Sequence, residues 1–497
     1  MIYAHSLGRA ARDFSDRAAL WSGDRWLTFS ELDHRVTDVV GALSKHGVGR
    51  GDRLAVLMPN GADYLQLIYA CVRLGVIVVP LNVRLSVVEI DRILADASPH
   101  GLIRHSSLPV PTAPLPWQLV IDQERLDLRD DGSRSAPLND PDAVLALIYT
   151  SGTTGHPKGV VVTHANMLAN VEHFDYWMPH TDGAVHLHAA PLFHIADFPV
   201  MFAAPAFGAA QVTIPRFSPQ EFCQTVADTQ VSHTVLVPTM MNLLTQFPEL
   251  EKYDLASLEE IAYGGSPMAP ELIRRTREVL PGVRLVQGYG LSETGFLTAL
   301  RDDEHVGQKL TSCGRPAPSV EVRVVDGSGA EVKAGEAGEL IARGANVTRG
   351  YWNDPKETAE AFCAGWFRTG DIGRQDADGF FYILDRLKDM IVTGGENVYS
   401  GEVEAVIYEH PAVLEAAVFG IPDPKWGELV AACVVVKAGK TLGADELIGH
   451  CRRSLANYKV PRRIEFSPSE LPKSGTGKIL KRALRERFWD HQKRAVS

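Results

Sequence analysis

The sequence predicts an α/β protein, with a large N-terminal domain of doubly wound sheets and a β-rich subdomain, followed by a small α+β C-terminal domain. Strand-like and helical patterns alternate through the first two thirds of the chain, and short β-rich pieces follow from about Cys313. A chain of 497 residues is also too long for one core, so two or three domains are expected. We place the boundary near Asp385, with domains at residues 1–384 and 385–497.

The first elements have the order of a βαβ unit. Apolar residues recur at helical spacing in residues 29–48, FSELDHRVTDVVGALSKHGV, and this pattern ends at Gly47. Within residues 52–82 a strand-like stretch (DRLAVLMP), a helical stretch (ADYLQLIYACVRLG) and a second strand-like stretch (VIVVPLN) follow. Parallel strands need a crossover of this kind, so the order predicts a parallel sheet with helices on its faces.

The same alternation returns between residues 185 and 265, which predicts a second doubly wound region. Its segments are VHLHAAPLFH, AAQVTIP, VSHTVLVPTMMNLL and LEEIAYGG. The later β-rich pieces are VEVRVVDG, GELIARG and GFFYILDRLKDMIV. The last stretch combines strands at EAAVFGIP and LVAACVVVKAG with helices at SGEVEAVIYEH and GADELIGHCRRSL, which is enough for a small separate domain.

The composition excludes several classes of function. A net charge of −11 leaves no broad basic surface for nucleic acid, and the basic run KRALRERFWDHQKR is typical of a solvated helix. No apolar stretch approaches the roughly 18–20 residues that span a bilayer, and the N-terminus lacks a signal-peptide pattern. The six cysteines form no CxxC pair, so they indicate neither a zinc site nor a disulfide framework and favour the reducing cytoplasm.

Residues 149–159, YTSGTTGHPKG, combine hydroxyls and glycines with one lysine, Lys158. They follow an apolar run, AVLALIY, and precede VVVTHANMLANVEHF, which begins as a strand pattern and continues as a helical one. A glycine-rich turn at a strand end lets backbone N–H groups approach an anion, and a lysine balances part of a polyphosphate charge. The Walker A pattern does not fit, because Gly159 and Val160 follow the lysine. Taken alone, the loop is more typical of a surface turn.

Further motifs downstream favour the phosphate-binding interpretation. They are YGGSPM (263–268), QGYGLSETG (287–295), WFRTGDIG (366–373), DRLKDMIVTGGEN (385–397) and PKSGTGKILKR (472–482). With these motifs the sequence closely resembles the acyl-adenylate-forming superfamily, which includes acyl- and aryl-CoA synthetases, carrier-protein adenylation domains and beetle luciferases. The resemblance runs from about residue 10 to residue 485, and several motifs in the family's order make it specific.

The resemblance implies an acyl-CoA synthetase that works in two half-reactions. A carboxylate attacks the α-phosphorus of ATP to give acyl-AMP and pyrophosphate, and a thiol then attacks the acyl carbonyl and expels AMP. This chemistry requires charge neutralisation at the α-phosphate, a metal to organise the phosphates and the exclusion of water. The implied cofactors are ATP, Mg²⁺ and coenzyme A, bound by an AMP-binding N-terminal domain and a mobile C-terminal domain.

The resemblance also implies which residues bind ATP. Those expected to hold the β- and γ-phosphates are Thr150, Ser151, Gly152, Thr153, Thr154, Gly155 and Lys158. Tyr289 should stack on adenine. Gly264, Gly265 and Ser266 should line the base and acyl sides, and Gln287, Gly288 and Gly290 should lie beside Tyr289. Asp371 and Arg386 should lie on the ribose. Ser292 stands where the family pattern YGxTE has threonine and keeps its hydroxyl for the α-phosphate, and Glu293 should hold Mg²⁺.

Lys478 is implied as the catalytic lysine of adenylation, reaching from the C-terminal domain to the carboxylate and the α-phosphate. One arrangement cannot serve both half-reactions, and family members rotate the small domain between them. Lys388 falls at the expected hinge. Rotation would withdraw Lys478 and bring Gly395 to the site, where it would leave room for the pantetheine arm. Arg216 and Trp426 are further candidates for contact with coenzyme A.

His194 sits where CoA synthetases of this family carry an aromatic or histidine gate between the acyl pocket and the adenylate, and no partner suggests that it ligates a metal. The sequence predicts an apolar acyl pocket with small glycine positions, which suits a flat aromatic or a medium-to-long aliphatic tail. A buried Asp197 would need a partner, so we expect it to point to solvent. The pocket should be lined by His194, Ala196, Asp197, Phe198 and residues 237–241, 264–267 and 290–291.

The acid and the thiol stay open at this point. A fatty acid is preferred, with an aromatic acid such as a benzoate or cinnamate close behind. No carrier module follows the Lys478 motif, so free coenzyme A is favoured over a separate carrier protein. A non-catalytic regulator is disfavoured because the expected lysines and carboxylates are present, and nothing points to luciferase chemistry. The expected partners are a small-molecule acid, ATP and coenzyme A, without nucleic acid; a homodimer is possible, since dimers are common in relatives.

Overall fold

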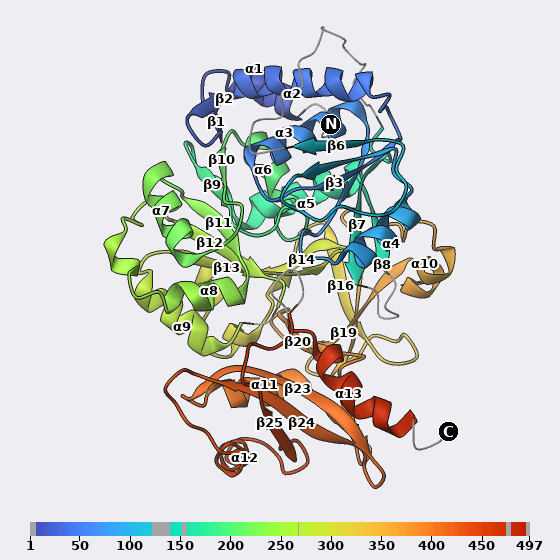
Figure 1. The fold of residues 1–497 in the computed structure, drawn as a ribbon. Coiled ribbons are helices and arrows are strands. Elements are labelled where there is room, and N and C mark those ends of the chain that lie inside the picture. The colour runs from blue at the N-terminus through green and yellow to red at the C-terminus, as the bar shows by residue number, and fades with distance from the viewer. Residues whose placement is uncertain (1–5, 122–139, 152–156, 267, 474–478, 494–497) are drawn as a thin grey trace.

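The computed structural model describes residues 6–121, 140–151, 157–266, 268–473 and 479–493. Figure 1 shows two large sheets with helices around them, a β-rich region beneath, and a small sheet with its own helices at the C-terminal end of the molecule. This arrangement confirms the α/β class and the succession of elements expected from the sequence. In the described part of the chain, no helix combines the length and apolar character needed to cross a membrane.

The first large sheet has six strands in the order β6-β5-β3-β4-β7-β8. Its neighbours run parallel except for β7 and β8, which form an antiparallel hairpin. The strands are β3 (Arg53–Leu57), β4 (Ile77–Pro80), β5 (Gly101–His105), β6 (Gln118–Ile121), β7 (Val144–Ser151) and β8 (Pro157–Thr163). The early helices are α1 (Ser6–Asp13), α2 (Phe29–Lys45), α3 (Ala62–Leu74) and α4 (Val87–Ala97). The predicted helix, strand, helix and strand of residues 29–82 are therefore confirmed.

The second large sheet has nine strands in the order β15-β14-β13-β12-β11-β9-β10-β1-β2. Its strands are β1 (Ala18–Trp21), β2 (Trp26–Thr28), β9 (Val185–His188), β10 (Ala210–Thr213), β11 (His233–Leu236), β12 (Glu260–Gly264), β13 (Arg284–Leu291), β14 (Gly295–Leu300) and β15 (Arg315–Pro316). Strands β9 to β13 run parallel, as the alternating pattern predicts. The accompanying helices are α5 (His164–Trp177), α6 (Val200–Ala206), α7 (Pro219–Thr229), α8 (Pro238–Thr245) and α9 (Pro270–Val279).

The main core joins the two large sheets through shared helices. Met167 and Phe174 of α5 and Phe202 of α6 belong to one buried cluster with Val78 of β4 in the first sheet and Val235 of β11 in the second. Helix α5 starts directly after β8, because the Thr163 hydroxyl accepts a hydrogen bond from the Asn166 N–H and the Asn166 side chain accepts one from the Thr163 N–H. This capping box converts the end of the hairpin into a helix that enters the core.

The remaining strands form two smaller sheets. The β-rich region contains β16 (Val320–Val325), β17 (Gly338–Gly344), β18 (Phe362–Cys363), β19 (Trp366–Gln375), β20 (Phe381–Arg386) and helix α10 (Pro355–Ala361). The C-terminal region contains β21 (Ile391–Thr393), β22 (Glu396–Val398), β23 (Val413–Asp423), β24 (Gly427–Val436), β25 (Arg463–Phe466), α11 (Ser400–Tyr408), α12 (Ala444–Arg452) and α13 (Lys481–Lys493). The β-rich piece at 379–392 thus divides between two sheets, and the chain passes from one to the other at residues 387–390.

Candidate active site

The predicted phosphate loop lies at the tip of the β7–β8 hairpin. Thr150 pairs with Lys158, and Ser151 pairs with Pro157. The other predicted phosphate-binding residues, Gly152, Thr153, Thr154 and Gly155, lie outside the described residues. The pairing places the two ends of the loop side by side, so Lys158 stands next to the hydroxyl-bearing residues that open it.

Lys158 is held by partners that the sequence did not indicate. Its ammonium group forms an ion pair with Glu357 of α10 and lies 5.5 Å from the centre of the Tyr351 ring. The Lys158 side chain is only 13% exposed. Glu357 is 199 residues further along the chain, so no local pattern could reveal the pair. Phosphate groups that bind Lys158 would therefore compete with a carboxylate for its charge.

Glu293 lies on the other side of Tyr351. The Tyr351 hydroxyl donates a hydrogen bond to Glu293 Oε1 at 2.8 Å, and the Glu293 carbonyl accepts one from the Thr348 N–H at 2.7 Å. Burial and the Glu293 charge raise the pKa of Tyr351, which keeps its hydroxyl protonated as a donor. Tyr351 therefore contacts both Lys158, the predicted phosphate-binding residue, and Glu293, the predicted metal-binding residue.

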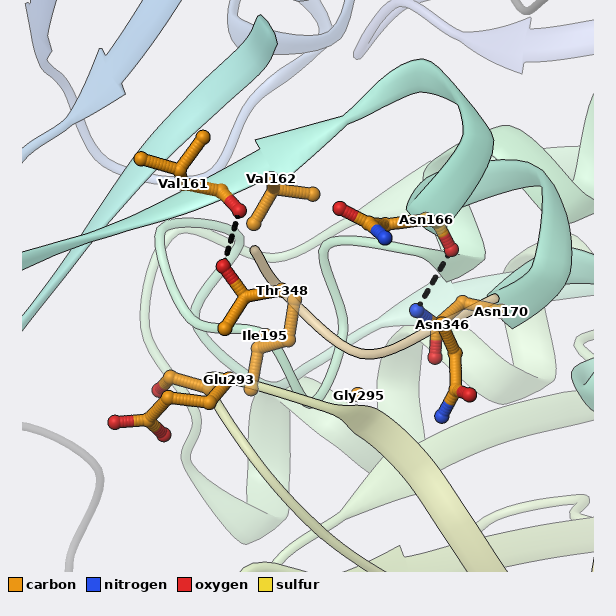
Figure 2. A pocket seen from close by; sticks show the side chains of 10 residues that line it. Val161, Val162, Asn166, Asn170, Ile195, Glu293, Gly295, Asn346 and Thr348 are labelled. Atoms are coloured by element: carbon orange, nitrogen blue, oxygen red, sulfur yellow. Dashed lines mark hydrogen bonds between the residues drawn. The ribbon is translucent and has the colours of Figure 1, made fainter. Parts of the chain in front are cut away.

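Ser292 and Glu293 are among the residues that line a small cavity, seen from close by in Figure 2. Thr348 closes it by donating its hydroxyl hydrogen to the Val161 carbonyl at 2.6 Å, and Asn170 donates to the Asn166 carbonyl at 3.0 Å. Figure 2 shows the Glu293 carboxylate directed away from Asn166, Asn170 and Asn346. The Glu293 carboxylate is therefore directed toward Tyr351, from whose hydroxyl it accepts a hydrogen bond.

Tyr289, Asp371 and Arg386 form a second cluster. The Tyr289 hydroxyl donates to Asp371 Oδ2 at 2.8 Å, and Arg386 Nε lies 2.8 Å from Asp371 Oδ1. Asp371 and Arg386 are direct neighbours across β19 and β20, which fixes their pairing. Burial and the Asp371 charge raise the pKa of Tyr289 well above its ordinary value. The structure thus brings together the three residues predicted for the adenine and the ribose.

The predicted glycine positions permit a close approach of neighbouring strands. Gly264 ends β12 and pairs with Gly288 of β13, and a Cβ at Gly264 would collide with the Gly288 carbonyl. A Cβ at Gly288 would lie 2.7 Å from the Phe296 ring, and one at Gly290 would collide with the Gly295 carbonyl. Gly265 and Ser266 continue from β12, and Gln287 accepts a hydrogen bond from Tyr263 at 3.3 Å. Gly264, Gly288 and Gly290 are therefore required for the close packing of the strands beside Tyr289, independently of any ligand.

The expectation that Asp197 points to solvent is wrong. Asp197 is fully buried, and its Oδ1 lies 3.0 Å from His188 Nδ1 and 3.9 Å from His186 Nε2. The two histidines alternate along β9, so both project to the face on which the turn at 191–199 packs. The spacing of His186 and His188, two positions apart in a strand, is the sequence signal that could have indicated buried partners for Asp197. His194, the predicted gate, is half-buried in that turn and accepts a hydrogen bond from the Ala196 N–H at 3.2 Å.

The passage between the last two sheets carries a further polar cluster that the sequence did not reveal. The buried Asp385 carboxylate accepts a hydrogen bond from the Ser400 N–H, and Lys481 bonds both the Ser400 hydroxyl at 2.6 Å and Glu404 at 2.8 Å. Lys388 itself is exposed, and its carbonyl accepts a hydrogen bond from Arg485 at 3.2 Å. These contacts link the end of β20 to α11 and α13 on either side of the predicted hinge.

The remaining residues predicted to contact coenzyme A or to catalyse adenylation do not belong to the clusters described above. Gly395 has φ +87° in the turn between β21 and β22, and no atom lies within 4 Å of the place of its Cβ. Trp426 covers the preceding glycine and is 40% exposed, and Arg216 is exposed. Lys478 lies outside the described residues. The space at Gly395 fits its predicted role beside a pantetheine arm, which stays a prediction, as do the roles of Trp426 and Arg216.

The chain matches a known protein family and is similar to several characterised enzymes. A family model described as AMP-binding enzyme matches residues 7–352, and one described as AMP-binding enzyme C-terminal domain matches residues 402–478. The chain is 39% identical to a feruloyl-CoA synthase from Amycolatopsis, covering 97% of this chain and 98% of that one. It is 35% identical to a long-chain-fatty-acid–CoA ligase from Mycobacterium tuberculosis, covering 94% of both. The structure of o-succinylbenzoate CoA synthetase from Bacillus subtilis with an acyl-adenylate intermediate matches 97% of both chains, with a TM-score of 0.86 and 32% identity.

Proposed function

The chain belongs to the AMP-binding enzyme family, and on that premise we propose that it joins an aromatic acid of the hydroxycinnamate type to coenzyme A. The enzyme is an AMP-forming acid–CoA ligase, which makes acyl-AMP from the acid and ATP and then transfers the acyl group to the thiol. The observation that carries the aromatic substrate is the 39% identity to a feruloyl-CoA synthase over nearly the full length of both chains. We therefore favour an aromatic acid over the fatty acid preferred from the sequence.

We assign nucleoside binding to the Tyr289, Asp371 and Arg386 cluster. Asp371 has two carboxylate oxygens with lone pairs beyond those used by Tyr289 and Arg386, so it can accept hydrogen bonds from both ribose hydroxyls. Arg386 holds the carboxylate in place through its ion pair with Asp371 Oδ1. The Tyr289 ring, fixed through its hydroxyl, offers a face for the adenine.

We assign phosphate binding to the hairpin loop and Lys158, and magnesium binding to Glu293. A carboxylate with one oxygen bonded to Tyr351 still has lone pairs for a hard cation, so the residue fits Mg²⁺. When bound, the ion would neutralise charge on the phosphates. Lys158 must exchange its Glu357 partner for a phosphate oxygen, and this exchange would moderate the grip on pyrophosphate so that the product can leave.

We assign the acyl pocket to the turn around His194 and to the ends of β11, β12 and β13. Phe198 and Met241, buried in the apolar clusters beside these elements, would form apolar walls, and Gly265 and Gly290 would leave positions without side chains. A flat ring fits such a set of walls better than a short polar acid does. A cytoplasmic location, a homodimer and the domain boundary near Asp385 stay predictions.

Competition between acids tests the substrate proposal. With ATP, Mg²⁺ and coenzyme A, kcat/KM should be at least about tenfold higher for ferulate or 4-coumarate than for octanoate or palmitate, because a pocket discriminates by the groups it can bury. Thioester is measured directly by mass. A higher kcat/KM for a fatty acid would contradict the proposal, and adenylate formation without any thioester would move the acceptor to a carrier protein.

A change at the predicted hinge tests the two-arrangement mechanism. Lys388→Pro should slow thioester formation from acyl-AMP by roughly tenfold or more, because proline fixes φ where a large dihedral change is required. Adenylate formation should be largely retained. Lys388→Ala is the matched control, since it removes the same side chain but leaves the backbone free. Equal losses in both variants would show that the side chain matters and the hinge does not.

A further inference from the structure

Three side chains in the core of the nine-stranded sheet have no place in the reaction described above. His186 and His188 project from β9, and Asp197 lies in the turn that follows; all three have no exposed surface. One potential ligand atom from each lies within 4.8 Å of the others. Buried polar groups in folded proteins are nearly always paired, so the way these three are satisfied needs an explanation.

Hydrogen-bond polarity fixes the state of the His188 ring. The Tyr69 hydroxyl donates its single hydrogen to the Met201 carbonyl, which can only accept. Tyr69 then accepts from Gln211 Nε2 at 3.0 Å, and Gln211 Oε1 lies 3.1 Å from both the Tyr69 hydroxyl and His188 Nε2. With the amide in this orientation, His188 Nε2 donates a hydrogen to Gln211 Oε1. In a neutral ring, the lone pair is left on Nδ1, where it faces Asp197 Oδ1 at 3.0 Å.

The lone pairs of His188 Nδ1 and Asp197 Oδ1 would repel each other unless a proton or a metal cation lies between or beside the two atoms. The neighbouring atoms point to more than one missing contact: among the described residues, both ring nitrogens of His186 and Asp197 Oδ2 are buried without a hydrogen-bond partner. A proton shared by His188 and Asp197 would satisfy that pair alone. It would leave His186 without a partner, whereas one cation bound by all three residues would also engage a ring nitrogen of His186.

We propose that His186, His188 and Asp197 bind a divalent transition metal of the zinc class, separate from the ATP site. Two imidazoles and a carboxylate are ligands typical of zinc. Ligand atoms around a tetrahedral zinc are separated by about 3.3 Å, and the observed separations of 3.0 Å and 3.9 Å from Asp197 Oδ1 bracket that value. The Gln211 contact supplies the outer hydrogen bond that orients a metal-binding histidine.

The consequence of such a site is structural. The three ligands come from twelve consecutive positions, 186–197, so the metal would bind β9 to the turn that carries His194. That turn is the wall of the proposed acyl pocket. A metal here would therefore hold a specificity element in position, without contact with the reacting atoms.

Metal content and cobalt spectroscopy test the proposal. The purified enzyme, without nucleotide, should retain about one equivalent of zinc per chain after dialysis, and Co²⁺ exchanged into it should show the visible bands of a tetrahedral site with nitrogen and oxygen ligands. His186→Gln and Asp197→Asn should each lose the retained metal and the bands. Chelation should lower the Tm of the wild type but leave that of His186→Gln unchanged.

His233→Gln is the matched control. His233 is also a fully buried histidine, on the adjacent strand β11, and its Nδ1 already bonds the Ser232 hydroxyl at 2.7 Å. This variant should keep the metal. The proposal is overturned if the wild-type protein neither retains zinc nor takes up Co²⁺ with tetrahedral bands, a result that does not depend on how the variants fold. Loss of metal in His233→Gln to the same extent would overturn the assignment of ligands.

Discussion

Lys478→Ala is expected to abolish the formation of acyl-AMP while leaving thioester formation from supplied acyl-AMP intact. The lysine is proposed to stabilise the negative charge that develops as the carboxylate attacks the α-phosphate, and removal of one such donor typically costs about 10²–10³ in rate. In the second half-reaction the α-phosphate is already joined to the acyl group in a mixed anhydride, and the proposed rotation would withdraw the lysine, so it should have no role. Pyrophosphate release and single-turnover thioester formation measure the two steps separately.

Lys473→Ala is the matched control for this experiment. Lys473 lies in the same segment, but its ammonium group bonds Glu415 at 2.5 Å and Glu470 at 2.8 Å within the C-terminal region. It should therefore retain both half-reactions. Equal losses of both half-reactions in Lys478→Ala would contradict its assignment to adenylation, as would a loss of pyrophosphate release in Lys473→Ala of the same size.

Asp371→Asn is expected to lower kcat/KM for ATP by roughly 100-fold. Two hydrogen bonds from ribose to a charged carboxylate are worth about 3 kcal/mol together, and the amide replaces one acceptor oxygen with a donor that faces Tyr289 or Arg386. The change also leaves Arg386 without its anionic partner. Initial rates at varied ATP and calorimetric binding of AMP measure the effect, with circular dichroism as the check on folding.

Asp376→Asn provides the comparison. Asp376 stands near the other end of the same β19–β20 hairpin and accepts hydrogen bonds from the Phe380 N–H and the Tyr382 hydroxyl, both at 2.9 Å. Its loss should perturb the hairpin turn but leave the affinity for AMP unchanged. An unaltered affinity in Asp371→Asn, or an equal loss in both variants, would remove Asp371 from the ribose site.

Much of the fold follows from patterns with a local cause. The apolar stretches at 76–82 and 231–236 predict buried parallel strands, and both occur as β4 and β11. The meeting of Tyr289, Asp371 and Arg386 was expected only through the motif resemblance, because Tyr289 and Asp371 are 82 residues apart. Once β19 and β20 pair, however, their register alone brings Asp371 opposite Arg386.

The features that were not predicted depend on contacts between residues distant in sequence, or on the His-x-His spacing of β9. Glu357 neutralises Lys158 from a helix in the β-rich region, and nothing near residue 158 indicates it. Asp197 was expected at the surface because a carboxylate in an apolar segment needs a partner, and its partners were the alternating histidines of a strand. The Lys481 contacts with Ser400 and Glu404 likewise arise only when α11 and α13 pack together.

In the proposed mechanism, the carboxylate of the acid attacks the α-phosphorus of ATP directly. The most direct test is an isotope transfer with ferulate labelled by ¹⁸O in both carboxylate oxygens, run with ATP, Mg²⁺ and coenzyme A. Direct attack should place one ¹⁸O atom in the AMP released and one in the thioester carbonyl, in equal amounts. Unlabelled AMP, or label in inorganic phosphate together with ADP, would show that the acid is activated by another route and would contradict the account.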